Sequence, residues 1–268
     1  MTLGRLEEIL RDTRRRVEGL RSQRAVLERR ALAAPPPPAF ARAVAPAAAV
    51  GVIAEVKRRS PSAGSIRGDL DPVTHATAYV EGEAVAISVL TDEVHFGGSL
   101  ADLAAVAAAV SVPVLRKDFV LDELQLFEAR AAGASAVLLI VRALPGPVLQ
   151  RLARAASGLG LGTLIEVHTE RELEAAVAAE PTAVGVNSRD LGTFTVDRGV
   201  AEAVLRLVPR RIPAIAESGI ETRADVARYA AAGADLVLVG TAVARATDPA
   251  AAVHGLTGVA RVPGVRPA

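Results

Sequence analysis

The chain has 268 residues, of which 51% are hydrophobic and only 3% aromatic, so we expect a core built mainly from Ala, Val, Leu and Ile. Its formal net charge of +1 excludes the strongly basic surface that binds nucleic acid or an anionic membrane, and it favours small polar metabolites as partners. Because the chain contains no cysteine, disulfides, a thiolate nucleophile and a cysteine-based metal site are excluded as well.

Residues 3–30 predict an amphipathic helix, because their apolar side chains recur at helical spacing. These side chains are Leu6, Ile9, Leu10, Val17, Leu20 and Leu27. We interpret the many arginines around them as the solvated face of this helix. The prolines of APPPPAF end the helix, since proline has no amide hydrogen to donate. Residues 1–48 are therefore expected to form an N-terminal helical extension with a proline-rich linker.

The same N-terminal region bears on location. The opening MTLGRLEEIL lacks the apolar core of a secretory signal, and its acidic residues argue against an organellar transit peptide. No apolar run along the chain approaches the ~20 residues that cross a bilayer. We therefore expect no membrane association and a cytoplasmic location.

From Gly51 onward, short β-branched runs alternate with alanine-rich helical segments. The runs are GVIAEV, AVAISVL, PVLRKD, AVLLIV, GTLIEV, AVGVNS, PAIAES and LVLVGT, beginning at residues 51, 84, 113, 136, 162, 183, 213 and 236. Apolar strands joined by helices are typical of parallel sheets, and eight successive units predict a (β/α)8 barrel over residues 49–258, with a C-terminal tail at 259–268. A doubly wound open sheet is the alternative, but no G-x-G-x-x-G pattern follows the first run.

Polar residues stand at the ends of these runs, where a barrel places its chemistry. They are Glu55, Lys57, Lys117, Glu166, Asn187, Glu217, Ser218, Gly240 and Thr241. Alternate residues of a strand face the same side, so Glu55 and Lys57 can both point into the mouth of the barrel as an ion pair. A single lysine or glutamate at a strand end is often only structural. Together these acids and bases predict proton-transfer chemistry without a metal.

Two glycine-containing turns predict a phosphate site. ESG at 217–219 and VGT at 239–241 end the last two runs, where barrels commonly bind phosphate through backbone amides. Ser60 and Ser62, in the loop after the first run, are candidate hydroxyl donors to the same group. Ordinary strand-to-helix turns are the alternative for all of these segments.

The four histidines are not spaced as metal ligands, and no metal is expected. They are His75, His95, His168 and His254. We expect His75 and His254 on exposed faces of helices, and His168 at the start of the loop just beyond Glu166. The G-x-S-x-G pattern of a serine nucleophile is also missing from the sequence.

Several long motifs follow one another along the predicted barrel. They are IAEVKRRSPSAG, AISVLTDEVHFGGSLADL, PVLRKDFVLDELQLFEARAAGASAVLLIV, LIEVH, VGVNSRDLGTF, IAESGI and VLVG. In these motifs the chain resembles the indole-3-glycerol phosphate synthase family of tryptophan biosynthesis, from about Gly51 to Thr241, and the N-terminal helix also fits. Two departures are His95, where the family usually has an aromatic residue, and the pair Thr241-Ala242, where it more commonly has an acidic or serine-containing pair.

The resemblance implies a substrate and a reaction. The substrate is 1-(2-carboxyphenylamino)-1-deoxyribulose 5-phosphate, a phosphorylated anthranilate-ribulose adduct, and the product is indole-3-glycerol phosphate. The steps are ring closure, decarboxylation and dehydration. No cofactor is needed, because the cationic ring intermediate is its own electron sink. The resemblance also leaves room for association with other enzymes of tryptophan biosynthesis.

It further implies roles for individual residues. Lys117 is the general acid that activates the carbonyl, while Glu166, with Lys57 and Glu55, serves the dehydration; the division of roles among these four is open. Lys57 also pairs with the substrate carboxylate, Asn187 and Ser218 bind sugar hydroxyls, and Glu217 orients a lysine. The anthranilate ring packs on Phe119, Leu138 and Leu191, with Arg189 close to the mouth. The residues implied at the phosphate are Ser60, Gly219, Gly240 and Thr241.

Two other functions fit parts of the pattern. A phosphoribosyl isomerase would share the phosphate site, but such enzymes work mainly with a carboxylate or cysteine acid-base pair, whereas two lysines and Glu166 converge here. A catalytically idle barrel that serves as a binding or scaffold subunit would be favoured by the loss of Lys117 or Glu166, and both are present.

Overall fold

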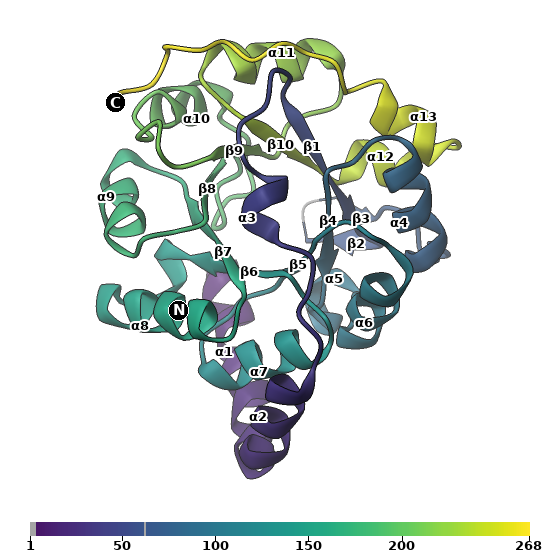
Figure 1. Ribbon diagram of the computed structural model, residues 1–268, viewed down its shortest axis with the longest axis vertical. Coiled ribbons are helices and arrows are strands. Elements are labelled where there is room, and N and C mark those ends of the chain that lie inside the picture. The colour runs from purple at the N-terminus through teal and green to yellow at the C-terminus, as the bar shows by residue number, and fades with distance from the viewer. Residues whose placement is uncertain (1–3, 62) are drawn as a thin grey trace.

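Eight parallel strands form a closed barrel surrounded by helices in the computed structural model, which describes residues 4–61 and 63–268 (Figure 1). The strands are β1 (Gly51–Val56), β4 (Ala86–Leu90), β5 (Val114–Lys117), β6 (Ala136–Ile140), β7 (Gly162–Val167), β8 (Ala183–Asn187), β9 (Ala214–Glu217) and β10 (Leu236–Val239). Each pairs with its predecessor, and β1 closes the barrel by pairing with β10, Gly51 opposite Leu236. The predicted (β/α)8 barrel is confirmed.

Helices connect the strands and cover the outside of the barrel. They are α4 (Pro72–Glu81), α5 (Glu93–Phe96), α6 (Leu100–Ala109), α7 (Glu123–Ala131), η2 (Val141–Ala143), α8 (Gly146–Gly158), α9 (Glu170–Ala178), α10 (Arg198–Leu205), α11 (Arg223–Ala231), α12 (Thr241–Arg245) and α13 (Pro249–His254). Many begin where a side chain accepts a backbone hydrogen bond in the first turn, as Ser99 does for α6 and Thr222 for α11. None of the described helices is both long and apolar enough to cross a membrane.

The N-terminal extension contains two longer helices and one short one. These are α1 (Arg5–Leu20), α2 (Arg24–Ala33) and α3 (Phe40–Ala43), with a 3-10 turn, η1 (Arg21–Gln23), after α1. The predicted helical extension is confirmed: helical structure runs from Arg5 to Ala33, with the 3-10 turn η1 between its two α-helices, and residue 3 lies outside the described residues. The two halves bury their apolar faces on different partners. Ile9 and Leu10 of α1 join the barrel-interior cluster, whereas Leu27 of α2 packs with α7.

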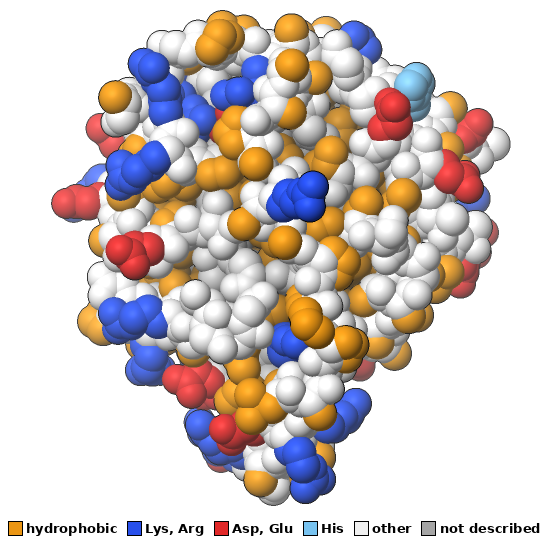
Figure 2. Space-filling model, in the orientation of Figure 1, with side chains coloured by type: hydrophobic (Ala, Val, Ile, Leu, Met, Phe, Trp, Pro, Cys, Tyr) orange, Lys and Arg blue, Asp and Glu red, His pale blue; other side chains and the backbone are white. Residues whose placement is uncertain are grey.

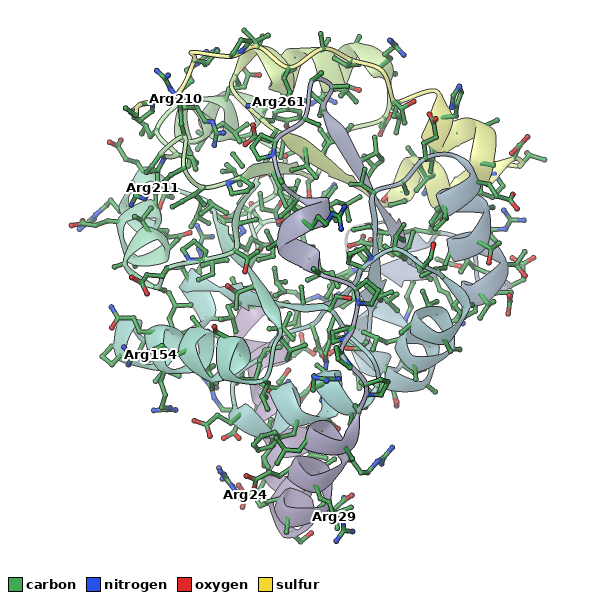
Figure 3. The ribbon with its side chains drawn as sticks, in the orientation of Figure 1. Arg24, Arg29, Arg154, Arg210, Arg211 and Arg261 are labelled. Atoms are coloured by element: carbon green, nitrogen blue, oxygen red, sulfur yellow. The ribbon has the colours of Figure 1, made fainter. Side chains whose placement is uncertain are left out.

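The arginine-rich surface of this extension is mostly solvated, as predicted. Arg24 and Arg29 point outward from α2 in Figure 3, and both are exposed. Arg16 on α1 is different, because its guanidinium binds the buried carboxylate of Asp118 at 2.8 Å. The extension is therefore attached to the barrel by a charged contact as well as by apolar packing.

The barrel interior is filled with aliphatic side chains and is covered at both ends by the N-terminal extension. Phe40 and Val44, in and just after α3, pack at one end, and Ile9 and Leu10 of α1 join the same cluster from the other. In Figure 1, α3 lies in front of the barrel and α1 behind it. Figure 2 shows the face that carries α3, where hydrophobic side chains are numerous and charges of both signs are scattered around the rim. Phe40 and Val44 close the barrel interior at this end, whereas the polar residues predicted for the site stand at the opposite end, where the strands finish.

The loop after β1 contains an unpredicted hairpin, β2 (Arg59–Ser60) and β3 (Gly64–Ser65). Arg58, immediately before it, donates from Nη1 to the carboxylate of Asp102 at 2.6 Å. Ala63 N donates to Ser60 Oγ at 3.1 Å within the turn. These bonds hold the described residues of the loop next to the carboxyl ends of the strands.

Candidate active site

The carboxyl ends of the strands open into a cavity of about 340 Å³, and all fifteen residues predicted for the site lie in its wall. They are Glu55, Lys57, Ser60, Lys117, Phe119, Leu138, Glu166, Asn187, Arg189, Leu191, Glu217, Ser218, Gly219, Gly240 and Thr241. They come from six strands, β1 and β5 to β9, from the loops after these strands and from the residues that follow β10. Ser62, the other hydroxyl proposed from the sequence, lies outside the described residues.

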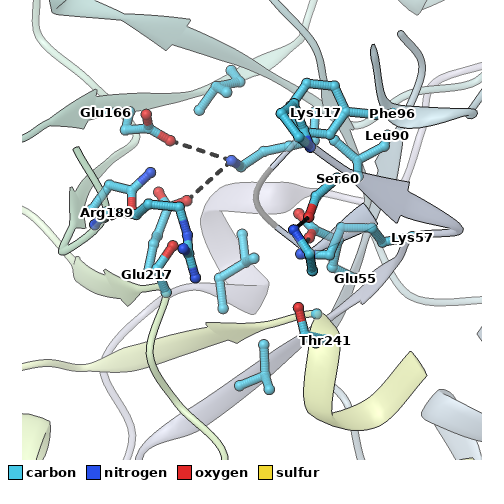
Figure 4. Close-up of a pocket in the computed structure, with 18 of the residues that line it drawn as sticks. Glu55, Lys57, Ser60, Leu90, Phe96, Lys117, Glu166, Arg189, Glu217 and Thr241 are labelled. Atoms are coloured by element: carbon cyan, nitrogen blue, oxygen red, sulfur yellow. Dashed lines mark hydrogen bonds and ion pairs between the residues drawn. The ribbon is translucent and has the colours of Figure 1, made fainter. Parts of the chain in front are cut away.

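Lys117 occupies the centre of the polar part of this cavity. Its Nζ lies 3.2 Å from Glu166 Oε2 and 3.2 Å from Glu217 Oε2 (Figure 4). Both glutamates are almost fully buried, with side chains 1% and 2% exposed. One ammonium group thus lies between two carboxyl groups that water hardly reaches.

Glu55 and Lys57 form a second pair in the same cavity. Lys57 Nζ lies 2.8 Å from Glu55 Oε1, and Ser88 Oγ donates to Glu55 Oε2 at 3.4 Å. Both side chains face the mouth, as the alternation along β1 predicts. Burial opposes ionisation of Glu55, but Lys57 and Lys117 outweigh it and lower the pKa of Glu55.

Lys117, Glu166 and Glu217 differ in protonation: one is a cation, one an anion and one a neutral acid. Burial disfavours the charged form of Lys117, but the nearby carboxylates, led by Glu217 and Glu166, outweigh it and raise the pKa of Lys117. Burial likewise opposes ionisation of Glu166, but Lys117 and then His168 lower the pKa of Glu166 below its ordinary value. For Glu217 burial is the largest effect and, although Lys117 opposes it, the pKa rises to about 8. At neutral pH the cavity therefore offers a protonated lysine beside an ionised and a protonated glutamate.

The two lysines of this cavity are the only lysines in the chain. All the other basic residues among the 31 Lys and Arg are arginines. An ammonium group can give up its proton, whereas an arginine guanidinium stays charged in proteins. A chain that uses arginine everywhere else has lysine only where side chains converge on the mouth, which is a signal for proton transfer that the spacing of motifs did not reveal.

Two glycines make room for the charged groups. A Cβ on Gly185 in β8 would lie 2.1 Å from Glu217 Oε1, and a Cβ on Gly240 would lie 2.4 Å from Glu55 Oε1 and 2.7 Å from Lys57 Nζ. Gly240 was predicted only as a phosphate-loop residue, and Gly185 was missed. Its signal in the sequence is a glycine inside an apolar strand, which marks a close approach.

The end of the cavity that is predicted to bind phosphate is formed by the loops after β9 and β10. Ser218 and Gly219 both have positive φ, 68° and 67°, and Ser188 Oγ donates to the Ser218 carbonyl at 3.1 Å. On the other side, Gly240 precedes α12, whose residues Thr241 and Arg245 line the cavity. Arg245 was missed from the sequence because it lies within a helix, one turn beyond the glycine.

An apolar wall faces the charged groups. Phe119, Leu138 and Leu191 lie there as predicted, and Phe96 adds a ring whose centroid is 6.3 Å from that of Phe119. Phe96 was missed, although it directly follows His95 at the end of α5, the short helix after β4. The His95 Nε2 lies 3.2 Å from Asp12 Oδ2 of α1, so this departure from the family pattern connects the extension to the mouth.

The histidines differ in exposure. The expectation that His75 is exposed is wrong: it is only 6% exposed, because it lies on the inner face of α4 together with Tyr79. His254 is exposed at the end of α13, as expected. His168 follows β7 directly and is buried. Over residues 4–61 and 63–268, no group of three or more His, Asp or Glu side chains is arranged to hold a metal ion.

Comparison with known proteins gives consistent similarities. The family model described as indole-3-glycerol phosphate synthase matches residues 6–256. The chain is 49% identical over 230 residues to the indole-3-glycerol phosphate synthase of Mycolicibacterium smegmatis, covering 86% of this chain and 84% of that protein. It is 49% identical over 217 residues to indole-3-glycerol phosphate synthase 1 of Streptomyces coelicolor, covering 81% of each.

Solved structures agree at the level of fold. A 3-hexulose-6-phosphate synthase superposes with a TM-score of 0.63 at 19% identity, over 77% of this chain and 98% of that one. The 3-hexulose-6-phosphate synthase from Salmonella typhimurium gives a TM-score of 0.60 at 18% identity, and the match covers 77% of this chain and 96% of that one. At such low identity these likenesses support the barrel architecture alone.

Proposed function

The chain belongs to the indole-3-glycerol phosphate synthase family, and from that premise we propose that its cavity converts 1-(2-carboxyphenylamino)-1-deoxyribulose 5-phosphate into indole-3-glycerol phosphate. In this proposal the enzyme is a carboxy-lyase that works by general acid-base catalysis without a metal or organic cofactor. The observation that carries the proposal is Lys117, whose side chain is only 13% exposed and whose ammonium group lies between Glu166 and Glu217 in the cavity wall.

Ring closure requires a proton donor at the carbonyl oxygen. The ring carbon that bears the carboxylate attacks the carbonyl carbon, and the electron pair of the C=O bond takes a proton from Lys117. The raised pKa of Lys117 keeps it protonated until the substrate oxygen becomes basic. Loss of carbon dioxide then returns an electron pair to the ring, so the protein supplies no electron sink.

Dehydration requires an acid and a base on the same intermediate. The hydroxyl made in the first step leaves as water after receiving a proton, and a base removes the proton from the neighbouring carbon. Glu55 and Glu166 have lowered pKa values and are therefore ionised bases at neutral pH. Lys57, which contacts Glu55, is the proposed acid and the partner of the substrate carboxylate.

The remaining wall residues are assigned to binding. Asn187 and Ser218 are proposed to bind sugar hydroxyls, and Glu217 to orient Lys117. The anthranilate ring is proposed to pack on the apolar wall, with Arg189 at its rim. The proposed phosphate ligands are Ser60, Gly219, Gly240 and Thr241. Both the cytoplasmic location and association with other enzymes of tryptophan biosynthesis stay predictions.

The proposal is tested by replacing each lysine with arginine, which keeps the charge but cannot release a proton. Lys117→Arg and Lys117→Met should both lower kcat by about 100- to 10,000-fold, the range of general acid catalysis. Lys57→Arg should keep KM near that of the parent, because binding a carboxylate needs only the charge, but it should also lower kcat, because arginine cannot supply the proton for dehydration. The measurement is steady-state formation of the fluorescent indole product from synthetic substrate.

Glu166→Gln extends the same test to the base. We expect it to keep its fold and its KM within a few-fold while losing most of kcat. A parent chain that fails to turn over this substrate, or a Lys117→Met variant that works at the parent rate, would refute the proposal.

A further inference from the structure

A buried histidine lies directly behind Glu166, and no step proposed above uses it. His168 follows β7, two residues after Glu166, and its side chain is 4% exposed. Its Nε2 lies 3.5 Å from Glu166 Oε1, and its Nδ1 lies 3.4 Å from Glu172 Oε2. The imidazole therefore stands between one carboxylate that faces the cavity and one that does not.

The two oxygens of Glu166 have different neighbours. Oε2 lies 3.2 Å from Lys117 Nζ and accepts its hydrogen bond, while Oε1 faces the His168 ring. Among the described residues, Oε1 and both ring nitrogens are buried without a completed hydrogen bond. Leaving buried polar atoms unpaired is costly, and a small rotation of the ring or the carboxyl group would pair Nε2 of His168 with Oε1 of Glu166. An apolar side chain in this place would fill the volume without that cost.

Glu172 lies on the far side of the ring and holds the backbone of His168. Its Oε2 accepts the backbone N–H of His168 at 2.7 Å, and its Oε1 accepts from Arg142 Nε at 3.1 Å. Arg142 in turn donates to Asp190 at 2.7 Å. Glu172 also lies in the first turn of α9, where a carboxylate stabilises the start of a helix, and this alone accounts for an acidic residue at position 172. It does not account for a histidine at position 168.

We propose that His168 is a positioning residue for Glu166: Glu172 holds the backbone N–H of His168, and the ring donates from Nε2 to Glu166 Oε1, so that Oε2 is left for Lys117 and the substrate. This inference rests on the proposed function for its catalytic consequences. A donor behind one oxygen favours the ionised carboxylate and fixes its plane. The other charged groups around this pair are Lys117 from β5, Glu217 from β9, Glu172 from α9 and Arg142 from η2.

The test compares two substitutions of His168 with a matched histidine elsewhere. His168→Leu should lower kcat about 10- to 100-fold with KM within about threefold, the size expected for losing a hydrogen bond to a charged group. Without this donor the carboxylate of Glu166 protonates more readily, so the acidic limb of the kcat–pH profile should move to higher pH. His168→Gln, whose amide can still donate, should recover part of kcat. His254→Leu, on exposed α13, should match the parent.

A structural role would give a different result. If His168→Leu and His168→Gln lose kcat equally, with an unmoved acidic limb, the ring serves packing alone and the proposal is wrong. A readout independent of turnover is the ¹⁵N NMR shift of the ring nitrogens. Glu166→Gln should change the His168 signals and leave those of His254 unchanged, and unchanged His168 signals would overturn the contact. Whether the parent chain turns over the substrate tests the proposed function, and this result does not depend on the role of His168.

Discussion

At the residue scale, Glu217 shows how burial sets protonation. The side chain is 2% exposed and lies 3.2 Å from Lys117, yet burial and the neighbouring Glu166 charge keep it protonated at neutral pH. Gly185 provides the space its carboxyl group occupies. Because Glu217 is neutral and Glu166 is ionised, Lys117 contacts both carboxyl groups without an excess of negative charge around it. Two glutamates in one pocket thus have different pKa values.

Glu217 should make the stability of the parent depend on pH. Its pKa is about 8 in the folded state against 4.5 ordinarily. Between these values the unfolded chain loses the proton and the folded chain keeps it, so stability falls as pH rises, by at most about 1.4 kcal/mol per pH unit. Glu217→Gln lacks this effect. Urea unfolding at pH 5.5, 6.5 and 7.5 should therefore show that, as the pH rises, the free energy of unfolding of Glu217→Gln increases relative to that of the parent.

The matched control for Glu217→Gln is Glu174→Gln on the exposed face of α9. The free energy of unfolding of Glu174→Gln should change with pH in the same way as that of the parent between pH 5.5 and 7.5. Parallel curves for Glu217→Gln as well would mean that Glu217 is ionised in the folded protein.

At the scale of an element, β5 and the residue after it place three consecutive charges on alternating sides. Lys117 points into the cavity, whereas Arg116 and Asp118 join a buried network on the outside. Arg116 donates to the Gln125 carbonyl at 2.6 Å and lies 3.2 Å from Glu128, and Arg16 of α1 binds Asp118. The outward pair holds the strand against α7 and α1, and thereby holds the lysine between them.

Arg116→Met should be strongly destabilising. Arg116 is 1% exposed, and loss of its guanidinium would leave the carboxylates of Asp118 and Glu128 with fewer partners away from water. Breaking a buried ion pair from one side costs about 3–5 kcal/mol. The free energy of unfolding in urea measures this, with exposed Arg154→Met as a control that should stay within about 0.5 kcal/mol of the parent. An unchanged midpoint for Arg116→Met would show that the network adds nothing to stability.

At the scale of the whole molecule, stability and chemistry lie at opposite ends of the barrel. The α3 end is closed by Phe40, which packs against Gly162 at the start of β7. The other end holds the cavity and is partly covered by α1 (Figure 1). This separation is typical of barrels, whose strand starts serve folding while strand ends serve function. The division into an extension to residue 48, a barrel to 258 and a tail stays a prediction.

Phe40→Ala should separate these two properties. The ring is 2% exposed, and its removal leaves a cavity that typically costs about 3–5 kcal/mol. Because the site lies at the far end of the barrel, kcat per folded molecule should not change. Thermal unfolding measures the stability, and initial rates at low temperature measure kcat per folded molecule. Val200→Ala, at an exposed position, is the control and should leave both unchanged. A lower kcat at parent stability would contradict the separation.

The barrel and most of its site followed from local patterns. Eight apolar runs with helical crossovers admit few arrangements, and a closed barrel brings Lys117 and Glu166 together although 49 residues separate them. The motif order identified the family because long segments such as IAEVKRRSPSAG combine several side chains with a backbone turn. Capping residues such as Ser99 and Thr222 marked helix starts for the same local reason.

The chain by itself determined which elements form, in what order, and which side chains stand at strand ends, because these depend on near neighbours. Tertiary structure alone decided the burial of His75, the clearance that Gly185 gives Glu217, and the different protonation of two glutamates around one lysine. Each of these depends on atoms brought within a few ångströms from distant segments. Their distances and their exclusion from water, which set the charges, exist only once the barrel has closed.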